Sequence, residues 1–127
     1  MNLIEFIYHD FFLKKIYPEG LSEFVRIGQF GLQDAGTFSM SIHTKQRPAL
    51  EIAKWGVYGR SYDVIVINLL GSGAKDINIS NWINTGFAFF DFSREGEDIR
   101  IQARESEWAF DITVASLSFQ SCSTYIE

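Results

Sequence analysis

The alternation of apolar and polar side chains over residues 36–44, which read GTFSMSIHT, is the feature that most limits the fold of this chain. Phe38, Met40 and Ile42 fall on one side of an extended backbone, and serine, threonine and histidine side chains fall on the other. A period of two residues is the pattern of a β-strand with one buried face. The segment EFVRIGQ at 23–29 alternates in the same way, so we expect the two to pair across the turn GLQDAG.

Six further segments have the length and composition of strands: ALEIA at 49–53, YDVIVINLL at 62–70, INIS at 77–80, GFAFFDF at 86–92, DIRIQAR at 98–104 and WAFDITVASLSFQ at 108–120. The second of these is apolar on both sides, which is typical of a central strand. In the last one the alternation slips by one residue near Ala115 and Ser116, and this predicts a β-bulge. The sequence GSG at 71–73 is too short for a phosphate-binding loop, so we expect a hairpin turn there, with glycines at positive φ.

About eight strands with no long helix between them predict a mainly β fold, either an antiparallel β-sandwich or a strongly curved sheet. At the N-terminus, Asn2 followed by Glu5 has the spacing of a capping box, which predicts a short helix with Leu3, Phe6 and Ile7 on its buried side. The sequence therefore predicts one domain over residues 1–127, with an N-terminal helical or extended segment at 1–20 and a β domain at 21–126.

The net charge of −5 lies entirely in the second half of the chain. Residues 1–63 hold seven basic and seven acidic side chains, whereas residues 64–127 hold four basic and nine acidic ones. Binding of nucleic acid needs a basic face, so we expect no nucleic-acid partner. The most apolar stretch, at 2–17, is interrupted by charged side chains and lacks the pattern of a signal peptide, so we expect no membrane association. A single cysteine, Cys122, fits a reducing cytoplasm.

Residue patterns of known catalytic and metal sites are missing from the sequence. His9 and His43 do not have metal-ligand spacing, and no serine has the glycine pattern of a nucleophile elbow. We therefore expect no metal site and no cofactor, and we expect that the protein is not an enzyme.

Acidic side chains are concentrated in two predicted turns and the strand before them, and these are the candidate partner-binding residues: Asp91, Glu95, Glu97, Asp98, Glu105 and Glu107. Carboxylates in turns are usually just solvated. They can also form a recognition patch for a basic protein. A pair of catalytic carboxylates, as in a glycosidase, is the third and least favoured interpretation.

Aromatic and basic residues are interleaved with glycine in RPALEIAKWGVYGRSYD at 47–63. Trp55, Tyr58 and Tyr62 in this segment are either core side chains that plug a turn or an exposed platform on which a sugar or another small ligand stacks. A coplanar, exposed arrangement of these rings would favour the platform, and burial of Trp55 would exclude it.

The order of several motifs resembles a family of small bacterial immunity proteins, catalogued as immunity protein fifty. The resemblance rests on Pro48 and Trp55 before a long apolar strand, on KDINISNW ending at Trp82, on the hairpin FFDFSREGEDIRIQA, and on a final tyrosine, Tyr125. It spans roughly residues 22–125 and does not include the N-terminal segment.

The resemblance implies an all-β protein made beside a polymorphic toxin in the same cytoplasm, which binds the toxin domain and blocks it. It implies no catalytic residues. We expect the cognate toxin to be basic, because an acidic inhibitor then gains association rate by electrostatic steering. The alternative hypothesis is a β-sandwich module that binds a carbohydrate or small ligand through the aromatic platform.

Overall fold

Ten strands in two sheets make up most of the computed structural model, which describes residues 2–127, and strands account for 52% of the chain. This confirms the mainly β prediction. The strands are β1 (Ile7–Tyr8), β2 (Phe24–Leu32), β3 (Phe38–Thr44), β4 (Val64–Ser72), β5 (Lys75–Ser80), β6 (Ala88–Phe89), β7 (Asp91–Glu95), β8 (Asp98–Arg104), β9 (Ala109–Val114) and β10 (Ser116–Tyr125). The helical elements are α1 (Phe11–Ile16) and the 3-10 turns η1 (Leu3–Phe6), η2 (Asp34–Gly36), η3 (Ala53–Trp55) and η4 (Trp82–Asn84).

The first sheet has six strands in the order β1-β10-β4-β3-β2-β6, and the second has four in the order β5-β9-β8-β7. Strand β4 lies in the middle of the first sheet, and β2 pairs with β3 as a hairpin, as the alternation predicts. Strand β1 runs parallel to β10, and the other strand pairs are antiparallel. Strand β1 was not predicted, because it is only two residues long. The single strand predicted at 86–92 is wrong, because this segment divides into β6 at the edge of the first sheet and β7 in the second.

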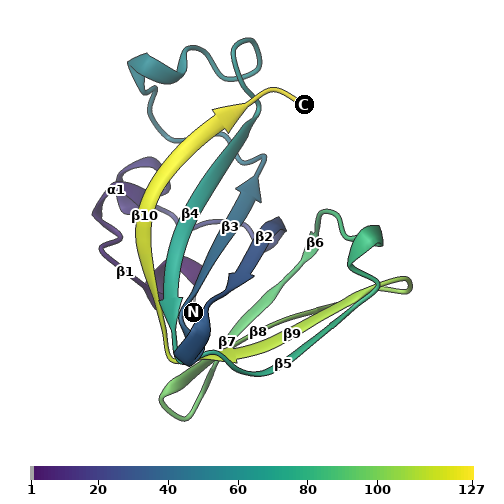
Figure 1. The fold of residues 1–127 in the computed structure, drawn as a ribbon. Helices are drawn as coiled ribbons and strands as arrows, with labels where there is room; N and C mark the ends of the chain where they lie inside the picture. The colour runs from purple at the N-terminus through teal and green to yellow at the C-terminus, as the bar shows by residue number, and fades with distance from the viewer. Residues whose placement is uncertain (1) are drawn as a thin grey trace.

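A single bent ladder joins the two sheets. Strand β4 pairs with β10 from Val64–Tyr125 to Ser72–Ser116, and the pairing resumes between β5 and β9 from Lys75–Thr113 to Ser80–Ala109. We call this pairing of β4 and β5 with β10 and β9 the long ladder. Figure 1 shows the two sheets diverging from the point where both of its strands turn.

The predicted hairpin at residues 71–73 is wrong, because β4 and β5 lie in different sheets and do not pair with each other. Gly73 has the expected positive φ of 66°, but Gly71 is an ordinary strand residue of β4. A Cβ added to Gly73 would lie 2.4 Å from the Cβ of Ala115, which separates β9 from β10. A glycine at position 73 therefore allows the two backbone segments to approach closely at the bend. The slip of alternation at Ala115 marks this bend: Ala115 separates β9 from β10, and the bulge within β10 falls later, between Phe119 and Ser121.

The N-terminal segment packs against the first sheet and completes the core. The predicted capping box is confirmed: the Asn2 side chain accepts from the Ile4 amide (3.2 Å), and Glu5 accepts from the Asn2 amide (2.7 Å). The turn it begins is a 3-10 turn with Leu3 and Phe6 buried. One continuous cluster of buried side chains extends from this segment through both sheets. No helix in residues 2–127 has the length and hydrophobicity needed to cross a membrane.

The predicted strand at 49–53 does not form. Leu50 is 41% exposed, and the amide of Ala49 donates to the carbonyl of Ile16 at the end of α1 (2.7 Å). The backbone of this segment is therefore anchored to the N-terminal segment and not to a neighbouring strand. It continues into the 3-10 turn Ala53–Trp55.

Candidate functional site

The face of the second sheet that points away from the core is polar, and its residues come from all four strands. In β8, Ile99, Ile101 and Ala103 are buried, so the residues between them point outward. The register places the outward positions of the neighbouring strands beside these. We call this surface the outer face; its residues are Lys75, Asn78, Ser80, Asp91, Ser93, Glu95, Asp98, Arg100, Gln102, Arg104, Ala109, Asp111 and Thr113.

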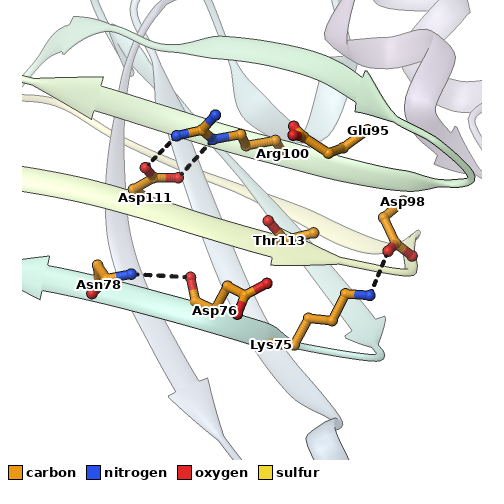
Figure 2. Close-up of a pocket in the computed structure, with 8 residues that line it drawn as sticks. All are labelled: Lys75, Asp76, Asn78, Glu95, Asp98, Arg100, Asp111 and Thr113. Atoms are coloured by element: carbon orange, nitrogen blue, oxygen red, sulfur yellow. Dashed lines mark hydrogen bonds and ion pairs between the residues drawn. The ribbon is translucent and has the colours of Figure 1, made fainter.

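A shallow hollow of about 330 Å³ lies on this face, lined by Lys75, Asp76, Asn78, Glu95, Asp98, Arg100, Asp111 and Thr113. Figure 2 shows two ion pairs within it. The Arg100 guanidinium binds both oxygens of Asp111, with Nε–Oδ1 at 3.0 Å and Nη2–Oδ2 at 2.8 Å. Across the hollow, Lys75 Nζ lies 2.7 Å from Asp98 Oδ2.

These ion pairs favour the charged forms of their members. The hydrogen bonds from Arg100 lower the pKa of Asp111, and the same contact raises the pKa of Arg100. A hydrogen bond to Asp98 raises the pKa of Lys75. All of these groups are partly exposed, so solvent screens the pairs and their main effect is to orient the side chains.

The second-sheet segment carries an acidic surplus, and the outer face itself holds four carboxylates (Asp91, Glu95, Asp98 and Asp111) against three cations (Lys75, Arg100 and Arg104). Residues 73–115 hold eight acidic and four basic side chains, which accounts for four of the five net negative charges of the chain. In the hollow, Lys75 and Arg100 neutralise Asp98 and Asp111. Asp76 and Glu95 have no cationic side chain within 4.0 Å in residues 2–127, so the hollow has two uncompensated carboxylates.

The six predicted partner-binding residues do not form one patch. Asp91, Glu95 and Asp98 share the outer face, and Glu97 lies in the two-residue turn beside them, with Gly96 at φ 65°. Glu105 and Glu107 lie in the turn after β8, at the opposite end of that seven-residue strand. The sequence shows acidic residues on both sides of β8, but it does not show that they lie at opposite ends of this strand.

The sequence did not single out Lys75, Arg100 or Asp111, which form the ion pairs of the hollow. Lys75 and Asp76 enter through the pairing of β5 with β9, which cannot be read from local alternation. The Arg100–Asp111 pair has a detectable signal, because in a hairpin centred on residues 105–107 these two side chains lie diagonally across one face.

In the hollow, Asp98 and Asp111 are paired with cations while Asp76 and Glu95 are exposed, an arrangement that can bind a cationic group. No group of three His, Cys, Asp or Glu side chains able to hold a metal ion occurs within residues 2–127. A catalytic general acid needs a carboxyl with a raised pKa, whereas the pKa of Asp111 is lowered.

The predicted exposed aromatic platform is wrong. Trp55 is only 8% exposed and Tyr62 is fully buried, which is the core arrangement that the sequence also allowed. The rings meet edge to face, at 71° between Trp55 and Tyr62 and at 86° between Tyr58 and Tyr62, so no coplanar surface exists for a sugar. Trp55 instead packs edge-on against Phe12 of α1, with ring centres 5.8 Å apart.

No protein-family model matches the chain, and searches of curated proteins and of solved structures gave no significant match. Function is therefore inferred from the chemistry of the outer face and from the motif order in the sequence.

Proposed function

We propose that this chain is an immunity protein that binds a cognate bacterial toxin domain in the cytoplasm and neutralises it stoichiometrically, without catalysis or a cofactor. The observation that carries the proposal is the outer face, where preoriented ion pairs surround carboxylates that have no cation of their own. The motif order shared with the immunity protein fifty family supports the same class of function.

A basic toxin fits the charge of this surface. The acidic surplus raises the rate at which a cationic partner collides in the correct orientation. A lysine or arginine of the toxin would then enter the hollow between Asp76 and Glu95. Lys75 and Arg100 already hold Asp98 and Asp111 in place, so little side-chain freedom is lost when the partner arrives.

The test is binding and protection with the toxin domain encoded beside this gene. We expect a 1:1 complex by calorimetry and growth rescue when both proteins are produced in one cell. The proposal is overturned if the wild-type protein neither binds nor protects.

The outer face is tested separately with the double variant Asp76→Asn, Glu95→Gln. Removing two charges that face the partner should lower the association rate several-fold at low ionic strength, and the loss should shrink as salt is added. The control is Glu19→Gln with Glu23→Gln, which removes the same charge from exposed positions outside the second sheet. Equal losses in the two double variants would show that only net charge matters and that the outer face is not the binding surface.

A further inference from the structure

The opposite charge gathers on the first sheet, around Arg26 of β2. Its Nη2 group donates to the Tyr125 hydroxyl (2.6 Å) and lies 3.3 Å from Nδ1 of His43. The Tyr125 oxygen and His43 Nδ1 are 2.9 Å apart. Arg26 and His43 are cross-strand neighbours, and Tyr125 reaches them from β10, across β4.

Proton accounting fixes the roles in this group. An arginine can only donate, so both the Tyr125 oxygen and His43 Nδ1, which lies 3.3 Å from the same Arg26 nitrogen, act as acceptors towards it. With Nδ1 unprotonated, the Tyr125 hydroxyl donates its hydrogen bond to Nδ1. The neutral imidazole then carries its proton on Nε2. Burial and the charge of Arg26 both lower the pKa of His43, which agrees with this assignment. The histidine and the tyrosine therefore hold the guanidinium in one orientation without neutralising it.

Arg26 is half-buried and lacks an ion-pair partner. Within residues 2–127 no carboxylate lies within 4.0 Å of it, and its Nε and Nη1 groups make no hydrogen bond. The neighbouring cation, Lys45, is already paired with Glu127 (3.0 Å). A fixed guanidinium with free N–H groups is the geometry that binds a carboxylate through two parallel hydrogen bonds.

An aromatic strip leads away from this guanidinium along the β2–β6 edge. Arg26 stacks on Phe87 (5.0 Å from the ring centre), Phe87 stacks on Phe24 (5.9 Å), and Phe24 contacts Phe89 (5.0 Å). Phe24 is 42% exposed and Phe89 is 72% exposed. An oriented arginine and a tyrosine beside exposed aromatic rings have the composition of a protein-binding hot spot.

We propose that Arg26, Tyr125 and Phe87, with the Phe24–Phe89 strip, form a binding site for a carboxylate of a protein partner, an Asp or Glu side chain flanked by apolar residues. We call it the arginine site. It is separate in position and in charge from the outer face, and it does not depend on the toxin proposal, because it can be tested without any toxin.

The probe is the peptide acetyl-Leu-Glu-Leu-amide, compared with acetyl-Leu-Gln-Leu-amide in NMR titrations of the whole protein. The glutamate peptide should shift the Arg26 Nε–H and His43 ring signals saturably, with a Kd on the order of 1 mM, and the glutamine peptide should bind about tenfold more weakly. Equal binding of both peptides overturns the proposal. A third probe, 3-phenylpropanoate, tests whether the carboxylate comes from a protein or from a small molecule. If it binds much more tightly than the glutamate peptide, the site serves a small molecule and the proposal fails.

Three variants locate the site. Arg26→Gln should weaken binding of the glutamate peptide about tenfold, and Tyr125→Phe, which keeps the charge but removes its clamp, should weaken it less. The matched control is Arg104→Gln, an exposed arginine at the end of β8, which should leave binding unchanged. If Arg104→Gln has the same effect as Arg26→Gln, or if Arg26→Gln stays folded and binds normally, the proposal fails.

Peptide binding at Arg26 should change the pKa of His43, whereas a purely structural role of Arg26 would leave this pKa unchanged. A carboxylate bound beside His43 favours its protonated form, so the pKa of His43 should rise when the glutamate peptide saturates the site and stay unchanged with the glutamine peptide. The charged groups that act on His43 are Arg26 and Glu127, and Glu127 is itself paired with Lys45. An unchanged pKa of His43 at saturation with the glutamate peptide would contradict the assignment.

Discussion

Ser72 and Ser116 form a hydrogen bond at the bend of the long ladder: their hydroxyl oxygens lie 2.6 Å apart at the last residue pair of β4 and β10. Beside them the Ala115 amide donates to the Ser72 carbonyl (2.9 Å), and the Ala74 amide donates to the Gly36 carbonyl (3.0 Å). Polar backbone groups are thus satisfied where the regular ladder is interrupted. The bend is therefore a hydrogen-bonded corner between the two sheets.

Replacement of Gly71 next to this corner should destabilise the fold. Gly71 faces Phe38 across the strands, and a Cβ added to it would lie 2.1 Å from the end of that ring. Phe38 is 2% exposed, and close packing of buried side chains leaves little room for its ring to shift. We expect Gly71→Ala to lower the free energy of unfolding by about 1–3 kcal/mol, measured by urea denaturation.

The control for this substitution is Gly86→Ala, where an added Cβ meets no atom within 4 Å and φ is not in the left-handed region. Its effect should stay within about 0.5 kcal/mol. Equal effects at Gly71 and Gly86 would show that contact with Phe38 does not limit the fold.

Loss of the Asn2 side chain should release the N-terminal segment. Asn2 accepts from the amides of Ile4 (3.2 Å) and Leu21 (3.0 Å) and donates to the Leu21 carbonyl (2.8 Å). Asn2→Ala leaves these partly buried groups unpaired, so we expect a loss of about 1–2 kcal/mol and faster hydrogen exchange at the Leu21 amide. Asn84→Ala, at an exposed position in η4, should change neither quantity, and unchanged exchange at Leu21 in Asn2→Ala would contradict the role of Asn2.

The thiol of Cys122 should react slowly in the native protein. Burial raises its pKa to about 12, so at pH 8 almost none of it is thiolate, the reactive form. We expect Ellman's reagent to modify the native protein many-fold more slowly than the urea-unfolded chain. Because the folded pKa exceeds the unfolded one, the thiol contributes stability below pH ~8.5 that is lost as the pH rises through the folded pKa. Equal rates in the native and unfolded states would show that the half-buried position of Cys122 does not suppress its reactivity.

The loss of folding stability at acidic pH should depend on Asp111. Its folded pKa is lowered by Arg100, so its contribution is present above the unfolded pKa of about 3.9 and is lost as the pH falls through the folded value. Asp111→Asn should therefore lower Tm by roughly a few degrees at pH 7, and the difference from wild type should shrink as the pH falls below the unfolded pKa and through the folded one. Asp34→Asn, at an exposed position without an ion pair, should follow wild type throughout; a pH-independent effect of Asp111→Asn would indicate packing instead of charge.

Local patterns in the sequence predict most strands of the second sheet, and they predict the hairpins β2–β3 and β7–β8. The turn after Arg94 is an example, because a charged loop with glycine at 96 separates two alternating segments that pair in register. Pairings between distant segments could not be predicted, since alternation reports only which face of a strand is buried. For that reason the continuation of β4 into β5 was mistaken for a hairpin.

The site was predictable in part for the same reason. Asp91, Glu95 and Asp98 are candidates in the sequence, but only the register of the β7–β8 hairpin shows that they share one face. Lys75 reaches Asp98 only because β5 joins the sheet from the far side of the bend. The arginine site lay outside the prediction altogether, although His43 and Tyr125 stood out in the sequence. Arg26 and Tyr125 are 99 residues apart along the chain.

The position of β10 between β1 and β4 has a consequence for how the protein folds. Strands β2, β3 and β4 are consecutive in the chain and neighbours in the sheet, with residues 33–37 joining β2 to β3 and residues 45–63 joining β3 to β4, whereas β10 follows every other strand along the chain. Until residues 116–125 leave the ribosome, β4 has an unpaired edge lined by apolar side chains such as Ile67 and Leu69. Such an edge is prone to pair with other chains, and closure of distant strands is slow, on the order of milliseconds to seconds. We therefore expect the nascent chain to need protection from aggregation until its last strand docks.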